Sequence, residues 1–356
     1  MRRVTRSMED HKYVGVEIEF TGVPLHTISN EVRSTKLGPI TRVMEDGSVR
    51  DRVTSYEGAI FYDEGDRRAN TVLGGEICTP IMDIDNPSSR ILLNQLCAIL
   101  EGNGAVPTER ASIHVHVNYL GAKTGDIRAL IRQFLNYESV LYRLSCGYAG
   151  NHRGVINDYQ YTRPLSSPIM VHTPEGSAAA IHQAVFNCNS FSEMLFNWTR
   201  IDMIVRDAPH YHPGRLHGLN LVPFLRQGSM EFRLFNSTMD GDLVWAWATL
   251  CSRLARYADN NWDERNPSPL GDRKKGFEPN AWFALLGIPE EAHAILMDVW
   301  ANTPWLPEPG RAGFEHYGRT IDFRRAIVPY SDAESQTMEY VPKRIINKEA
   351  ISRLFV

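Results

Sequence analysis

The stretch Val14-Gly15-Val16-Glu17-Ile18-Glu19-Phe20 organises the rest of the chain. Its β-branched and aromatic residues predict a strand, yet two glutamates occupy alternate positions. Because side chains two residues apart on a strand point to the same face, Glu17 and Glu19 should share one face and the apolar residues the other. Two carboxylates this close repel each other, so one pKa should rise unless a cation lies between them. A solvated acidic face on an edge strand is the alternative, and the other strands must decide.

The composition is that of an ordinary globular protein. The 356 residues are 43% hydrophobic and 22% charged, with a formal net charge of -4. This suits one large domain or two and argues against a polyanionic partner. Five scattered cysteines without a CxxC pair indicate free thiols in a reducing compartment. The sequence contains neither a signal-peptide pattern nor an apolar run long enough to span a membrane, so we expect a cytoplasmic protein without a membrane partner.

Strand and helix patterns alternate without the regular spacing of βαβ units. Beyond the opening stretch, strand patterns cover a hairpin at 42–49, residues 72–80, 111–118, 216–221 and 229–235, the last two joined by a short turn at Gln227-Gly228. Helical patterns cover residues 24–37, 88–100, 124–146, 177–197, 242–257 and 279–301, and Ser88 is the expected N-cap of the second. The pattern predicts an α+β fold: an antiparallel-rich sheet with helices on one face and an open, concave face. A change of composition divides the chain into a catalytic domain, 1–262, and a helical and loop extension packed on it, 263–356.

Four of the predicted strands carry strongly polar side chains on one face, spaced by two residues. These are Glu17 with Glu19, Glu76 beside Cys78, His114 with His116, and Glu231 with Arg233. If the strands are neighbours, their polar sides form one concave surface with four carboxylates, two imidazoles and a guanidinium. Each pair taken alone fits a solvated surface better than a site, so the prediction rests on their joint occurrence.

The residue types on this surface favour hard divalent cations. Four carboxylates in one cleft repel strongly without cations, and carboxylates with imidazoles suit Mg²⁺ or Mn²⁺. Mg²⁺ with few protein ligands usually shares its shell with substrate phosphates, whose oxygens a nearby arginine such as Arg233 neutralises. The surface therefore predicts a site for ATP phosphoryl transfer. The sequence has no P-loop, no GxGxxG at a strand–helix junction and no GxSxG elbow, which argues against the common nucleotide and hydrolase folds.

The same residues fall in motifs that resemble the amidoligase (carboxylate–amine ligase) family of the glutamine synthetase and glutamate–cysteine ligase superfamily. In chain order the motifs lie at residues 15–20, 46–48, 75–80, 113–117, 161–165, 215–221 and 228–236. The ordered set covers residues 13–258, and the remainder matches no motif. The resemblance implies a catalytic domain like that of glutamine synthetase.

The resemblance also implies an activity: ATP would convert a carboxylate to an acyl phosphate, and an amine would displace phosphate to form an amide. It implies these ligands of two or three Mg²⁺ ions: Glu17, Glu19, Glu76, His114 and Glu231. According to the resemblance, His116 contacts ATP phosphate and Arg233 stabilises the transferring phosphoryl group. Arg163 and Arg215 would bind the substrate carboxylate or acyl phosphate, and Asn220 would support them. The 147–175 loop is a candidate lid, and Asp46 is a turn residue or a base for the incoming ammonium.

Two other classes of protein stay open at this stage. A guanidino-kinase-like phosphotransferase uses a related fold and phosphorylates nitrogen without forming an amide, and a non-catalytic binding protein could keep the same sheet. The substrates are open as well. The carboxylate and amine could belong to an amino acid, a peptide or protein terminus, a cell-wall component or a modified base. An oligomer is compatible with the sequence.

Overall fold

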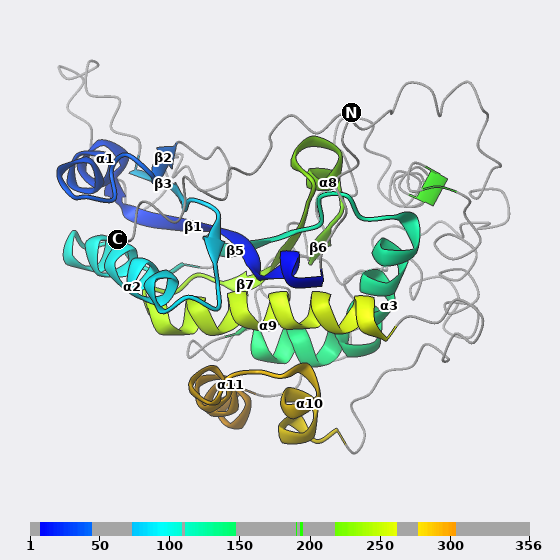
Figure 1. Ribbon diagram of the computed structural model, residues 1–356. Helices are drawn as coiled ribbons and strands as arrows, with labels where there is room; N and C mark the ends of the chain where they lie inside the picture. Colours follow the sequence, from blue (N-terminus) through cyan, green and yellow to red (C-terminus); the bar gives the residue numbers. More distant parts are fainter. Residues whose placement is uncertain are drawn as a thin grey trace, which may run out of the picture.

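The computed structural model describes residues 8–44, 73–108, 111–146, 190, 193–194, 218–261 and 277–303. Their centre is a seven-stranded antiparallel sheet in the order β2-β3-β1-β5-β7-β6, with β4 paired to β1 (Figure 1). The strands are β1 (Tyr13–Pro24), β2 (Arg42–Met44), β3 (Leu73–Cys78), β4 (Met82–Asp83), β5 (Ser112–Asn118), β6 (Leu219–Asn220) and β7 (Ser229–Asn236). The predicted α+β class and antiparallel sheet are confirmed.

The long strand β1 is central because its apolar residues alternate and can be buried. Val14, Val16 and Ile18 are almost fully buried and lie opposite Val117, Val115 and Ile113 of β5, respectively. Directly opposed residues of antiparallel strands project to the same face. The apolar residues of the central strands therefore form one continuous face.

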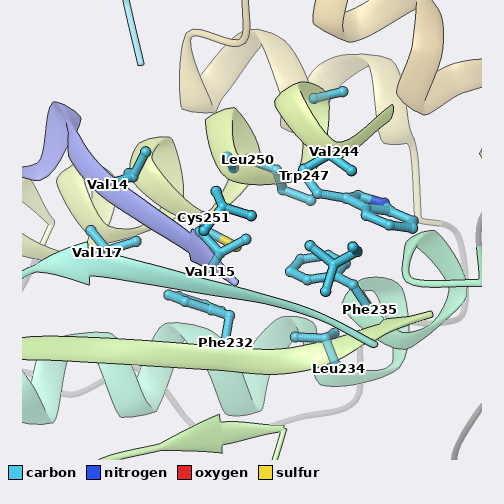
Figure 2. Packing of buried hydrophobic residues seen from close by; sticks show 14 of the residues in the cluster. Val14, Val115, Val117, Phe232, Leu234, Phe235, Val244, Trp247, Leu250 and Cys251 are labelled. Atoms are coloured by element: carbon cyan, nitrogen blue, oxygen red, sulfur yellow. The ribbon is translucent and has the colours of Figure 1, made fainter. Parts of the chain in front are cut away.

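Three long helices cover this apolar face: α2 (Pro87–Gly102), α3 (Thr124–Leu144) and α9 (Gly241–Asn260) (Figure 1). Figure 2 shows Trp247 and Cys251 of α9 among side chains of β1, β5 and β7. The Trp247 ring stacks on Phe235 with 4.8 Å between centroids, and its Nε1 donates to the carbonyl oxygen of Leu144 at 2.9 Å. The apolar face is thus closed, which leaves the opposite face of the sheet for polar groups.

Two local predictions, one for a helix cap and one for a turn, were wrong. The N-cap of α2 is Asn86, whose side chain accepts from the backbone N–H of Ser88, because Pro87 occupies the first turn and needs no hydrogen-bond acceptor. The link between β6 and β7 is a helix, α8 (Val222–Gln227), rather than a short turn. Asn220 Oδ1 accepts from the backbone N–H of Val222 at its start, and Gly228 ends it with a φ of 72°.

The remaining helices are α1 (Leu25–Ser34), α10 (Pro279–Leu286) and α11 (Glu290–Asn302). The single helix predicted at 279–301 is therefore two, because Gly287 adopts a left-handed φ of 67° and Pro289 follows it. Helix α11 packs against α9 and α3, with the Arg143 guanidinium 3.8 Å from the centre of the Trp300 ring. Whether a domain boundary falls at residue 262 stays a prediction.

Several predicted segments lie outside the described residues. They are the turn of the hairpin at 42–49, the loop at 147–175 and most of the helix at 177–197. Among the helices that are described, none is both long and apolar enough to cross a membrane.

Candidate functional site

The register of the sheet gathers the predicted polar residues on the face opposite the long helices. Glu17 of β1 lies opposite His114 of β5 on one side and Cys78 of β3 on the other. Glu19 lies opposite Glu76, and Glu231 lies between His116 and Asn220. Four predicted polar strands are thus neighbours. Outside the described residues lie Arg163, Arg215, Asp46 and the 147–175 loop.

Arg233 lies at a β-bulge in β7. Ile113 and Val115 of β5 are two residues apart, but their partners Phe235 and Phe232 are three apart. The extra residue lets both phenylalanines face the core while Arg233 lies beside Glu231. Its Nη1 donates to Glu231 Oε1 at 2.5 Å, so the two side chains form a buried ion pair rather than the solvated surface pair that either strand taken alone would suggest.

A buried hydrogen-bond relay joins Glu19, Ser112 and His114, which are 1%, 0% and 2% exposed. The Ser112 hydroxyl donates to Glu19 Oε2 at 2.5 Å. The hydroxyl oxygen of Ser112 also lies 2.8 Å from Nε2 of His114. Since the only hydroxyl proton goes to the carboxylate, His114 must donate through Nε2. Its Nδ1 then faces Glu17 Oε2 at 3.0 Å and Glu231 Oε1 at 3.5 Å. Two carboxylate oxygens around one ring nitrogen require a proton or a metal cation between them.

A second group of contacts surrounds His116. Its Nε2 lies 3.2 Å from Glu17 Oε1, and its Nδ1 lies 3.1 Å from both Ser229 Oγ and Gln227 Nε2. Since the Gln227 amide nitrogen is a donor, Nδ1 accepts and Nε2 is left to carry the proton toward Glu17. Each carboxylate oxygen of Glu17 thus faces one imidazole.

The pKa of Glu17 differs from the one expected from the sequence. Burial raises the pKa of its carboxyl, but hydrogen bonds from His114 and His116 outweigh burial and hold that pKa well below its ordinary value. Burial also raises the pKa of Glu231, and the charges of Arg233, His116 and His114 lower it overall. The pKa of His116 is raised, because its hydrogen bond to Glu17 and the charge of Glu231 exceed the opposing effect of burial. The predicted rise is therefore wrong for Glu17, since hydrogen bonds from two imidazoles favour its charged form.

Ligand atoms on this face lie close enough together to hold metal ions. One set comprises Glu17, His116 and Glu231, and a second comprises Glu17, Glu76 and Cys78, with the ligand atoms of each set within 4.8 Å of one another. The nitrogen and oxygen donors of the first set fit Mg²⁺ or Mn²⁺. His116, expected at ATP phosphate, is the imidazole of that set, while both nitrogens of His114 face protein groups.

Three polar residues of this network were not predicted from the sequence as functional residues. Ser112 continues the period-two row of His114 and His116, so the same alternation could have identified it. Gln227 and Ser229 flank the end of α8, and only the tertiary structure brings them to His116.

The comparison with known families agrees with this geometry. Residues 10–255, more than half of the chain, match the family described as "Putative amidoligase enzyme". The chain belongs to the amidoligase family. All the described polar residues of the site lie within the matched segment of this amidoligase, whereas α10 and α11 lie outside it. No curated protein matches the chain.

Proposed function

We propose that this amidoligase joins a carboxylate to an amine in a reaction that depends on ATP and Mg²⁺, through an acyl phosphate. Its family supports a ligase-type activity. The observation that carries the finer proposal is the single polar face on which Glu17, His116, Glu231 and Arg233 meet. Such a face is unsuited to a dry core and well suited to phosphate and divalent cations.

Divalent cations held by Glu17, Glu76, Glu231 and the imidazoles, with Glu19 as a further proposed ligand, would neutralise phosphate charge during transfer. The chain's own groups supply positioning. Asn220 Nδ2 donates to Glu231 Oε2 at 2.6 Å, and Arg233 donates to the other oxygen, so the carboxylate cannot rotate freely. The pKa of Arg233 is raised, because the charges of Glu231 and Glu19 outweigh its burial. This arginine therefore stays charged and is the proposed partner of the transferring phosphoryl group.

The proposed reaction has two balanced steps. The terminal phosphoryl group of ATP moves to a substrate carboxylate oxygen and ADP leaves. The amine nitrogen then attacks the carbonyl carbon, phosphate leaves, and a base takes the proton from nitrogen. We assign the substrate carboxylate to Arg163 and Arg215, and the exclusion of water to the 147–175 loop. Asp46 is the candidate base.

Hydroxylamine provides a test that does not require the natural amine. The purified protein, Mg²⁺ and ATP are incubated with a panel of amino acids and peptides plus hydroxylamine, and ADP and acyl hydroxamate are measured. Glu231→Gln should abolish both products, because it removes a charge that Arg233 and Asn220 hold in place. Glu101→Gln, the same change at an exposed position on α2, is the matched control and should keep full activity.

The products separate this proposal from the two alternatives. A phosphorylated nitrogen without hydroxamate would indicate a phosphotransferase. Failure of the folded protein to bind Mg-ATP by calorimetry would indicate a non-catalytic binding protein. Either result would overturn the ligase proposal.

A further inference from the structure

The second ligand set, Glu17, Glu76 and Cys78, differs chemically from the first because it includes sulfur. Cys78 lies opposite Glu17 in the register of β1 and β3, so both side chains project to the polar face. Its Sγ lies 3.5 Å from Glu76 Oε1. The other described cysteines, Cys97, Cys146 and Cys251, are buried, whereas Cys78 is only partly buried and sits among carboxylates.

A second sulfur atom borders this set. Met44 of β2 lies opposite Glu76, and its Sδ is 3.9 Å from Cys78 Sγ. The position of Met44 depends on Gly75, because a Cβ at Gly75 would lie only 2.6 Å from the Met44 carbonyl oxygen. The backbones of β2 and β3 therefore approach closely at this point, on the strand pair that carries both sulfur atoms.

We propose that Glu17, Glu76 and Cys78, bordered by the Met44 thioether, form a binding site for a thiophilic divalent cation of the Cd²⁺, Zn²⁺ or Co²⁺ class. Thiolate and thioether sulfur select softer ions than Mg²⁺, and the two carboxylates supply charge. The amidoligase resemblance assigns Glu17 and Glu76 to Mg²⁺ and gives no role to sulfur. The inference concerns cation binding alone and does not depend on the ligase reaction.

Binding requires the thiol to lose its proton to solvent as the sulfur–metal bond forms. A divalent cation among these groups offsets the charges of Glu17 and Glu76, and a coordinating thiol is deprotonated outright. Since Glu17 belongs to both ligand sets, an ion at the sulfur-containing set should also change cation binding at Glu17, His116 and Glu231.

The direct test is a titration of the metal-free protein with Cd²⁺, without ATP, followed by ultraviolet sulfur-to-metal charge-transfer absorption. The wild type should show a band that saturates at one equivalent. Cys78→Ser should lose the band, and Cys188→Ser, the cysteine outside the described residues, should keep it. Circular dichroism must show that both variants are folded.

A second variant distinguishes a built site from a lone reactive thiol. Glu76→Gln keeps both sulfur atoms but removes one carboxylate ligand. Loss of a group that only supports a ligand typically lowers metal affinity by roughly 10- to 100-fold, so loss of a ligand should lower the Cd²⁺ affinity at least as much. A band that survives Cys78→Ser, an affinity unchanged in Glu76→Gln, or no band in the wild type would each overturn the inference. Because no nucleotide or substrate is present, none of these results depends on the ligase proposal.

Discussion

Replacing Ser112 by alanine tests the buried relay on which the arrangement of the site depends. The Ser112 hydroxyl donates to Glu19 and accepts from His114, and all three residues are buried. Alanine leaves a carboxylate oxygen without its donor and a ring N–H without its acceptor. Neither can turn to water without moving the strands that hold it.

The magnitude follows from these two bonds. A hydrogen bond to a charged group contributes about 1.5–3 kcal/mol to stability, and a neutral one contributes about 1 kcal/mol. We therefore expect Ser112→Ala to lower the free energy of unfolding of the metal-free protein by about 2–4 kcal/mol. Ser252→Ala is the matched control, because Ser252 on α9 is also fully buried and its hydroxyl has no hydrogen-bond partner in the described part of the chain. Its expected change is below about 1 kcal/mol.

Urea unfolding in the presence of a chelator measures both variants. Nitrogen NMR of the His114 ring gives a second readout, because the Nε2 signal should report a hydrogen bond to Ser112 in the wild type and the loss of that bond in Ser112→Ala. A metal titration should also show weaker Mn²⁺ binding in Ser112→Ala than in Ser252→Ala. The relay is refuted if the two variants unfold at the same urea concentration and the Nε2 signal of His114 is the same in Ser112→Ala as in the wild type.

Three further perturbations are expected to have defined effects. Gly75→Ala should destabilise the protein by about 1–3 kcal/mol in urea unfolding, because its Cβ would clash with Leu25 and the Met44 carbonyl. The control Gly102→Ala has open space around it and should leave the stability unchanged. Equal effects of the two substitutions would contradict the packing argument. Glu17→Gln should abolish ADP formation. It should also modestly lower the melting temperature of the metal-free protein, because His114 and His116 lose their carboxylate partner. An unchanged or higher melting temperature would mean that repulsion between the carboxylates dominates. Hydrogen bonds from Arg90 hold the pKa of Asp242 at about 2, below 3.8, so this pair stabilises the fold above about pH 4 and loses that effect as pH falls toward about 2. With side chains 34% and 38% exposed, the contribution should be only about 0.5–1 kcal/mol, and the stability difference between wild type and Asp242→Asn should shrink over that pH range.

Sequence alternation was sufficient to predict which polar side chains of each strand share a face. Side chains on a strand repeat every two residues whatever the neighbours are, so Glu17 with Glu19 and His114 with His116 could be placed without coordinates. The antiparallel α+β class followed from the order of strand and helix patterns in the same way. The consequence for charge did not follow, because the pKa of Glu17 depends on imidazoles almost a hundred residues away.

Long-range pairing decided the rest. The sequence had no means of showing that β5 lies between β1 and β7, which is what brings His114 to both Glu17 and Glu231. It also gave no reason to expect a bulge at Arg233, since simple alternation puts Phe235 on the polar face and the opposing Ile113 keeps it in the core. Face membership is a local property of the backbone, whereas strand order, register and bulges are set by the packing of distant residues, and so only the tertiary structure could show which polar groups touch.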